Sequence, residues 1–296
     1  MTSRAAWEAV ADFWPRAATS QFVRAAELDF HVQVSGSGDD VLMLHGAGAS
    51  SHSFAELAER LSTHYRVIAP DLPGQGFSSL LPTDAVGLVP FANYLESLLM
   101  TLGAVPRWVV GHSAGAALAA QYALRTASPP EAMLCINAAF NPFGAGAAPI
   151  FSKAARWLAG NQWLPKVLAS PALRWRATGS MLADTGSSVD PTMSRCYDVL
   201  LGNPEHIAGT IRMMAGWDLP PLLAALSRLD MPVWLAAAEG DRTIPPERST
   251  SVANQLRRGR TVLVPELGHL AHEEAPDVFE QLFSEMVAAS ASRNGS

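Results

Sequence analysis

Short apolar runs alternate with longer amphipathic stretches along most of the chain. The apolar runs have the length of buried strands and cover residues 28–34, 41–44, 66–69, 108–111, 133–136, 233–237 and 261–264. The amphipathic stretches have the length of helices and cover residues 53–61, 91–102, 114–125 and 274–288. Alternation of this kind predicts an α/β fold, in which helices cover both faces of a mostly parallel sheet.

One of these helices begins with a recognisable capping signal. Ser53 is followed three residues later by Glu56, which is the spacing of a capping box. We therefore expect Ser53 to be the N-cap of the helix over residues 53–61.

The alternation stops between residues 141 and 218. This segment has no strand pattern and contains four tryptophans and four methionines. Its seven Lys or Arg and five Asp or Glu give two surplus positive charges, which leaves −8 for the rest of a chain whose net charge is −6. We predict a helical cap over residues 141–218, lying over the C-terminal edge of the sheet. The core of the α/β fold would then comprise residues 1–140 and 219–296.

Composition excludes several classes of protein. Hydrophobic residues make up 49% of the 296 residues and charged residues 16%, which is too apolar for a disordered chain. The net negative charge argues against nucleic acid as a partner. Cys135 and Cys196 are too few for a disulfide framework, so we expect free thiols in a reducing compartment.

Nothing in the chain resembles a membrane span or a secretory signal. No apolar run reaches 18 residues, and Glu8 and Asp12 interrupt the only place for a signal core. We expect a cytoplasmic protein without a transmembrane segment. The apolar composition is compatible with loose contact with a membrane surface.

The strongest chemical signal is the sequence GHSAG at residues 111–115. It follows a predicted strand and opens an alanine-rich helix, which is the context of a nucleophile elbow. The glycines allow a sharp turn that projects the Ser113 hydroxyl, and the helix N-terminus favours developing negative charge. We expect Ser113 to be a catalytic nucleophile.

A serine nucleophile needs a base and a group that orients the base. Asp241 and His269 each follow a predicted strand, in the chain order that this architecture uses. We expect His269 to take the proton from Ser113 and Asp241 to orient the imidazole. Glu239 is the alternative acid, His272 is the alternative base, and Asp230 precedes its strand and faces the wrong end of the sheet.

The sequence HGAG at residues 45–48 follows another strand and matches a loop that supplies an oxyanion-hole N–H group. We assign the oxyanion hole to the backbone N–H groups of Ala47 and Ala114. The expected substrate contacts are His45, Gly46, His112 and Trp217.

No cofactor or metal is indicated. The histidines at positions 45, 52 and 64 lack a metal-ligand spacing, residues 46–48 lack the third glycine of a dinucleotide loop, and there is no Walker lysine. The turn at residues 71–76 is more readily explained by structure than by catalysis.

With these residues in place, the chain resembles the α/β-hydrolase superfamily over roughly its whole length. The motifs are LHG at 44–46, DLPG at 71–74, GHSAG at 111–115, GD at 240–241 and GH at 268–269. Within the superfamily it resembles the magnesium-chelatase accessory proteins of bacteriochlorophyll biosynthesis. That closer match rests on residues 14–16, 111–117, 137–144, 179–180, 185–187, 213–219 and 268–274. Where this family often has histidine, the chain has Gln75, which weakens any role for that position.

The resemblance implies a place near magnesium insertion in photosynthesis and contact with magnesium chelatase, but it implies no defined reaction. Three hypotheses remain open. The first is a serine hydrolase of an ester-like small molecule, which in this setting would be a pigment-pathway ester. The second is a non-catalytic accessory protein that binds a porphyrin on its Trp- and Met-rich, cationic cap. The third is a general carboxylesterase or C–C bond hydrolase outside pigment synthesis, since fold alone does not select the reaction.

Overall fold

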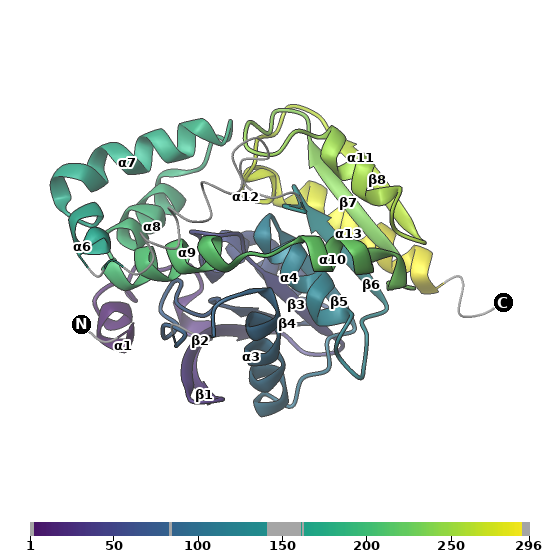
Figure 1. Cartoon of the computed structure of the whole chain (residues 1–296), viewed down its shortest axis with the longest axis horizontal. Coiled ribbons are helices and arrows are strands. Elements are labelled where there is room, and N and C mark those ends of the chain that lie inside the picture. The colour runs from purple at the N-terminus through teal and green to yellow at the C-terminus, as the bar shows by residue number, and fades with distance from the viewer. Residues whose placement is uncertain (1–2, 83–84, 141–160, 162, 292–296) are drawn as a thin grey trace.

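A sheet of eight strands runs through the molecule in the order β1-β2-β4-β3-β5-β6-β7-β8 (Figure 1). This computed structural model describes residues 3–82, 85–140, 161 and 163–291. Strand β2 pairs antiparallel with β1 and β4, and the other neighbouring strands pair in parallel. The predicted mostly parallel α/β sheet is therefore confirmed. The strands are β1 Ser20–Ala25, β2 Leu28–Ser35, β3 Asp40–Leu44, β4 Arg66–Pro70, β5 Trp108–His112, β6 Ala132–Ile136, β7 Val233–Ala238 and β8 Gly259–Val264.

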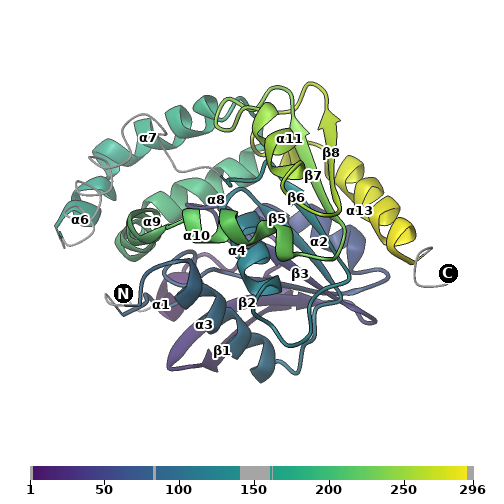
Figure 2. The ribbon, with the colours of Figure 1, turned by 45° about the vertical axis from the view of Figure 1, so that its right-hand side comes forward.

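Both faces of the sheet are buried, as strand β3 illustrates. Leu42 and Leu44 pack into one core cluster, whereas Val41 and Met43 pack into another, because successive side chains of a strand point to opposite faces. The first cluster includes side chains from α3 Leu88–Thr101, α4 Ala114–Ala123, α10 Pro220–Ala225 and α11 Glu247–Ala253. The second includes side chains from α2 Ala55–Leu61 and α13 Pro276–Ala291, which lies across the sheet from α3 in Figure 2.

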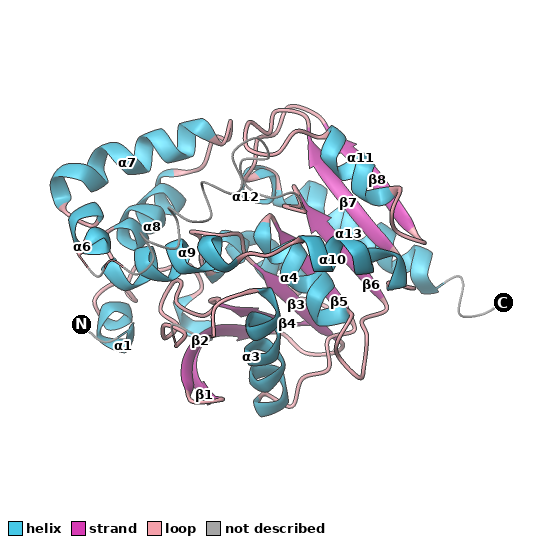
Figure 3. Cartoon of the chain, viewed as in Figure 1, coloured by secondary structure: helices cyan, strands magenta, loops and turns pink. Residues whose placement is uncertain are grey.

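The described part of residues 141–218 is built from helices, drawn in cyan in Figure 3. They are α6 Leu164–Leu168, α7 Pro171–Asp184, α8 Pro191–Leu201 and α9 Pro204–Gly216. Asp190 and Asn203 cap the starts of α8 and α9 by accepting hydrogen bonds from backbone N–H groups. Residues 141–160 and 162 of the predicted cap lie outside the described residues, so the cap boundaries remain a prediction. None of the helices in the described ranges has the length and apolar character needed to cross a bilayer.

The predicted N-cap role of Ser53 is wrong. The chain first makes a 3-10 turn, Ser51–Phe54, and α2 then begins at Ala55 without a side-chain cap. The Ser53 hydroxyl is instead 2.9 Å from His272 Nε2 and donates a hydrogen bond to Glu273. A long-range polar contact has replaced the local one that the sequence pattern predicted.

Other differences from the sequence prediction concern the ends of elements. Strand β1 is not predicted because its sequence, SQFVRA, lies at the sheet edge and is largely exposed or half-buried. Helix α3 begins at Leu88 rather than at residue 91. The predicted helix over 274–288 corresponds to α13, which begins at Pro276 and ends at Ala291. The short helix α12 Ala271–Glu274 precedes it and stops before Pro276, which disfavours helical geometry at the residue before it.

Candidate active site

Ser113 occupies a strained turn between β5 and α4. Its φ is +51° and its ψ is −118°, a conformation that costs a non-glycine residue about 1–3 kcal/mol. The Ser113 N–H donates a 2.9 Å hydrogen bond to the carbonyl of Ile136, which holds the turn against β6. The strain is what the sharp strand-to-helix reversal requires, and it directs the serine toward the pocket described below.

The two glycines of the GHSAG sequence are needed by this turn. A Cβ atom at Gly115 would lie 2.0 Å from the carbonyl oxygen of Leu44, and one at Gly111 would lie 2.6 Å from Cα of Ala116. Both distances are far below van der Waals contact and both neighbours are backbone atoms. Helix α4 therefore packs directly on the end of β3, which brings Ser113 beside the loop that follows β3.

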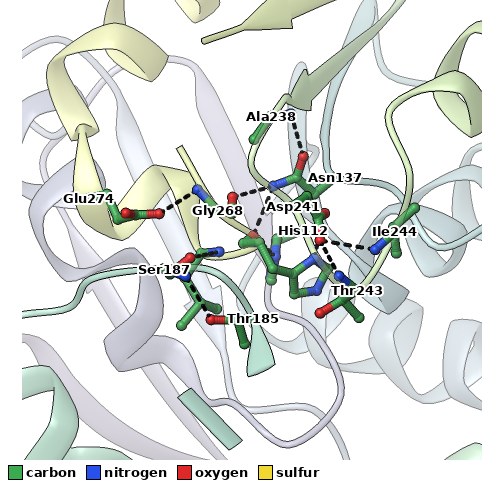
Figure 4. Close-up of polar contacts among 12 residues, drawn as sticks. His112, Asn137, Thr185, Ser187, Ala238, Asp241, Thr243, Ile244, Gly268 and Glu274 are labelled. Atoms are coloured by element: carbon green, nitrogen blue, oxygen red, sulfur yellow. Dashed lines mark hydrogen bonds and ion pairs between the residues drawn. The ribbon is translucent and has the colours of Figure 1, made fainter. Parts of the chain in front are cut away.

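His269 and Asp241 form a buried hydrogen-bonded pair. His269 Nδ1 lies 2.8 Å from Asp241 Oδ2, and the Asp241 side chain is fully buried. The other oxygen, Oδ1, accepts the backbone N–H groups of Thr243 at 2.7 Å and Ile244 at 2.9 Å (Figure 4). A carboxylate fixed in this way accepts a hydrogen bond from Nδ1–H, which leaves Nε2 of His269 unprotonated and able to act as a base.

The loop that carries His269 is held by two side chains from neighbouring strand ends. The His269 carbonyl accepts hydrogen bonds from Nε2 of His112 and from Nδ2 of Asn137, both at 2.9 Å. Asn137 also donates to Gly268 O at 3.1 Å and accepts from Ala238 N at 2.8 Å, so it links the ends of β6, β7 and β8 (Figure 4). Sequence analysis found Asn137 only as part of a family match and gave it no function.

The environment around His269 keeps its neighbouring imidazoles neutral. His112 and His272 are buried, and their ring centroids are 4.5 Å apart. The ring centroids of His112 and His269 are 4.8 Å apart. Burial lowers the pKa of His112 well below its usual value, and burial lowers that of His272 to about 3. Neither ring therefore competes for protons near neutral pH. His272, the alternative base, interacts with Ser53 instead of Asp241.

The residues that follow α7 form hydrogen bonds with the loop that carries His269. The Thr185 carbonyl accepts the His269 N–H at 3.0 Å, and the Ser187 hydroxyl accepts the Leu270 N–H at 2.8 Å. Glu274 completes the junction, because its carboxylate accepts from Gly268 N at 2.8 Å and Ser188 N at 3.0 Å. Figure 4 shows the contact between Glu274 and Gly268, with Thr185 and Ser187 on the other side of this loop. Residues from the predicted cap thus help to hold the candidate base.

The loop after β3 is held from both sides. His45 is completely buried, where its Nε2 accepts Leu72 N at 2.9 Å and its Nδ1 donates to Gly46 O at 2.8 Å. Gln75 is also buried and accepts the Gly48 N–H at 2.7 Å. Contrary to the sequence analysis, position 75 has a defined part in supporting the loop that contains Ala47.

Five of the predicted site residues line one pocket of about 520 Å³. Ser113, His269 and Ala47 line it, together with Gly46 and His112 from the expected substrate contacts. Its remaining lining residues are Gly48, Ala49, Ala177, Ser180, Met181, Leu182, Asp184, Thr185, Tyr197, Met214, Thr243 and Leu270. A mostly apolar pocket with a few polar groups is typical of a small-molecule site. The structure contains no hydrogen bond between Ser113 and His269 within the described residues.

Two expected substrate contacts lie elsewhere. His45 supports the loop behind the pocket, as described above. Trp217 packs in the main core cluster with its ring 5.7 Å from that of Phe91, in an edge-on arrangement. Neither side chain is part of the described pocket lining. Tyr197, which sequence analysis did not select, lines it from α8.

The Tyr197 hydroxyl connects the pocket to a buried carboxyl group. It donates a 2.6 Å hydrogen bond to Oε1 of Glu273, which also accepts the Ser53 hydroxyl. Oε2 of Glu273 is buried without a hydrogen-bond partner. Burial raises the pKa of Glu273 to about 7, although the two hydrogen bonds act in the opposite direction.

We expect this carboxyl group to make stability depend on pH. Because the folded-state pKa of Glu273 is raised from about 4.5 to about 7, its contribution is complete below pH 4.5 and is lost as the pH rises to 7. The loss amounts to at most about 3 kcal/mol in the free energy of unfolding. Urea unfolding across this pH range should show a flatter profile for Glu273→Gln than for the wild type. Glu239 is exposed, so Glu239→Gln should show the same dependence of stability on pH as the wild type. If Glu273→Gln shows that dependence too, Glu273 is not the group responsible for it.

Comparison with known proteins gives the chain a family. A model described as "Alpha/beta hydrolase family" matches residues 41–282. The "Magnesium-chelatase 30 kDa subunit" of Rhodobacter capsulatus is 39% identical over 266 residues, which cover 89% of this chain and 93% of that protein. The "2-hydroxy-6-oxo-6-phenylhexa-2,4-dienoate hydrolase" of Burkholderia cepacia is 25% identical, covering 91% of this chain and 96% of its own length.

Solved structures agree at the level of the fold. A thermophilic esterase from Thermogutta terrifontis superposes with a TM-score of 0.71 at 20% identity, over 92% of this chain and 98% of the esterase. The resemblance to the superfamily is confirmed by the matched family model. Given the matched model and the similarity over most of its length to the Rhodobacter capsulatus protein, the chain belongs to the alpha/beta hydrolase family.

Proposed function

We propose that this protein is a serine hydrolase in which Ser113 is the nucleophile, His269 the general base and Asp241 the group that orients the base. The observation that carries the proposal is the strained Ser113 turn opening into the same pocket as the His269–Asp241 pair. A strained backbone is retained where the surrounding structure requires it. Here Ser113 lines the pocket, and its hydroxyl forms no hydrogen bond within the described residues.

The proposed reaction follows from the geometry. The Ser113 hydroxyl attacks a carbonyl carbon while Nε2 of His269 takes its proton. The imidazolium that forms keeps its Nδ1–H on Asp241, whose second oxygen is held by two backbone N–H groups. His269 then returns the proton to the leaving group. Water, activated by the same base, releases the acyl group in the second half of the reaction.

The backbone N–H groups of Ala47 and Ala114 would stabilise the tetrahedral oxyanion. Ala114 is the first residue of α4, so intrahelical bonding leaves its N–H open. Ala47 lines the pocket on the loop that His45 and Gln75 support. One such donor contributes about 3 kcal/mol to transition-state stabilisation. Because the backbone supplies both groups, substitution of either alanine would leave them in place.

Labelling with a fluorophosphonate tests the serine directly. The reagent reacts with activated serines, so the folded wild-type protein should be labelled on the peptide that contains Ser113. Ser113→Ala should remain unlabelled. Absence of labelling in wild-type protein with a native circular dichroism spectrum would refute the proposed nucleophile.

For the cellular role, we propose an accessory function in magnesium insertion during bacteriochlorophyll synthesis. The support is the 39% identity with a protein named as a magnesium-chelatase subunit. Magnesium insertion into protoporphyrin by purified chelatase should be faster with this protein than without it. If the Ser113→Ala variant accelerates insertion equally and binds porphyrin, the non-catalytic porphyrin-binding hypothesis would replace the hydrolytic one.

A second candidate is hydrolysis of a C–C bond. The relative from Burkholderia cepacia, named for hydrolysis of a 2-hydroxy-6-oxo dienoate, is 25% identical over nearly its whole length. That compound serves as the probe, and its consumption can be followed by absorbance. Turnover of the dienoate with no turnover of esters would favour this candidate.

We expect Ser187 to position His269 rather than to contact substrate. Ser187→Ala removes the acceptor of the Leu270 N–H, so the histidine loop should loosen and kcat should fall about fivefold with little change in KM. The exposed neighbour Ser188→Ala provides the control, because only its backbone N–H is used. Ser187→Thr keeps a hydroxyl and should recover activity. Equal kcat values for all these variants would exclude a positioning role.

A further inference from the structure

Helices α6 and α7 expose a group of large apolar side chains that the proposed reaction does not use. Trp163 is 65% exposed, Val167 56%, Leu168 38% and Leu173 46%. We call these four residues the cap face. Exposed apolar residues are ordinary when scattered, but these four fall within the short segment 163–173, and such a concentration indicates a surface that contacts something apolar.

The segment that carries the cap face also carries positive charges. The Lys166 ammonium lies 5.0 Å from the centroid of the Trp163 ring, and Arg174 and Arg176 follow on α7. Arg174 pairs with Asp198, whereas Lys166 and Arg176 form no ion pair within the described residues. From residue 163 to residue 183 the sequence has no Asp or Glu, although the whole chain carries a net charge of −6. The combination of Trp, aliphatic and cationic side chains is typical of a surface that meets lipid headgroups and acyl chains.

The position of the cap face suits contact with a flat surface. Helix α6 and the end of α7 next to it lie at the outer edge of the molecule, on the side opposite to α13 (Figures 1 and 2). The other end of α7 lines the pocket with Met181 and Leu182. One helix therefore joins the cap face to the candidate active site.

We infer that the cap face is a docking surface for an anionic lipid bilayer. The apolar side chains would enter the boundary between headgroups and acyl chains, and Lys166 and Arg176 would face anionic headgroups. The occupant is argued from charge: a cationic, apolar surface on an acidic protein complements an anionic membrane, whereas another copy of this chain would bring a net negative charge to it. An apolar substrate could then pass along α7 from the membrane into the pocket, and this consequence rests on the proposed function. The docking inference does not depend on the proposed function.

Co-sedimentation of the full chain with vesicles tests the inference. Vesicles of phosphatidylglycerol and phosphatidylcholine in equal parts should bind the wild type more tightly than vesicles of phosphatidylcholine alone. The triple variant Trp163→Gln/Val167→Gln/Leu168→Gln should bind at least about tenfold more weakly, because several partly inserted side chains are lost. Lys166→Gln/Arg176→Gln should lose about fivefold or more for the anionic vesicles only.

The control is Met100→Gln/Val105→Gln. These side chains are 76% and 63% exposed at the far end of α3, so the control removes similar apolar surface away from the cap face and should bind like the wild type. Ser113→Ala should also bind like the wild type, which separates docking from any failure of the proposed hydrolysis. Lack of binding by the wild type, or equal binding by the triple variant, would overturn the inference. So would a wild-type dimer that the triple variant abolishes in the absence of vesicle binding, because a second copy would then be the occupant.

Discussion

Ser113→Ala is expected to lower kcat for p-nitrophenyl ester hydrolysis by about 10⁴-fold or more. The alanine keeps the pocket and the backbone N–H groups but removes the atom that would form the acyl-enzyme, and such groups act as a unit whose loss is nearly complete. The activity that remains would come from binding and from the oxyanion hole. Wild type and variant should be compared with short and long acyl chains, because the pocket is mostly apolar.

Ser180 supplies a matched control for this measurement. It lines the same pocket from α7 but lies within a helix and has no strained backbone. Ser180→Ala should keep kcat within about threefold of the wild type. If both variants retain turnover, the ester is hydrolysed by a group other than Ser113, and the proposed nucleophile is wrong.

The parts of the structure that sequence analysis predicted are those in which local pattern and chemistry agree. Apolar runs bounded by Gly or Pro gave the positions of the buried strands, because a parallel strand covered on both faces has no polar positions. The GHSAG sequence located the strained turn since two glycines at that spacing are required where α4 meets the end of β3. Asp241 and His269 were found because each follows a strand at the same edge of the sheet.

What sequence analysis missed depends on contacts between distant segments. Ser53 has the local signature of an N-cap, yet its partners His272 and Glu273 lie about 220 residues further along the chain. Asn137 links three strand ends, and Tyr197 reaches the pocket from α8. No periodicity or motif encodes these meetings, since they arise only when the sheet order and the cap helices are fixed in space.

Trp217 is a residue that sequence analysis selected for the pocket but that the structure places in the core. An aromatic residue in a segment rich in Trp and Met was expected to contact substrate, but its side chain packs against Phe91 in the core. Large aromatic side chains contribute more to the core by burial than any other residue type. Composition alone does not distinguish a pocket from a core, because both are apolar.

Asp241→Asn is expected to reduce kcat/KM by about 10³- to 10⁴-fold while leaving the fold intact. Oδ1 of Asp241 accepts two backbone N–H groups, so the amide oxygen of asparagine would occupy that position and its NH₂ group would face His269. An NH₂ group cannot accept a hydrogen bond from Nδ1–H and would instead donate one to an unprotonated Nδ1. The imidazole would then carry its proton on Nε2, the atom that must accept the proton of Ser113.

The alternative acid identified from the sequence is the matched control for this result. Glu239 lies two residues earlier on the same loop, but it is exposed, and its backbone N–H donates a hydrogen bond to the carbonyl of Val264. Glu239→Gln removes the same charge and should keep kcat/KM within about twofold, because an exposed charge at that position is screened by solvent. Loss of activity in Glu239→Gln with retention in Asp241→Asn would exchange the two assignments. A comparable loss in both would indicate that net charge near His269, rather than the tautomer that Asp241 selects, governs the rate.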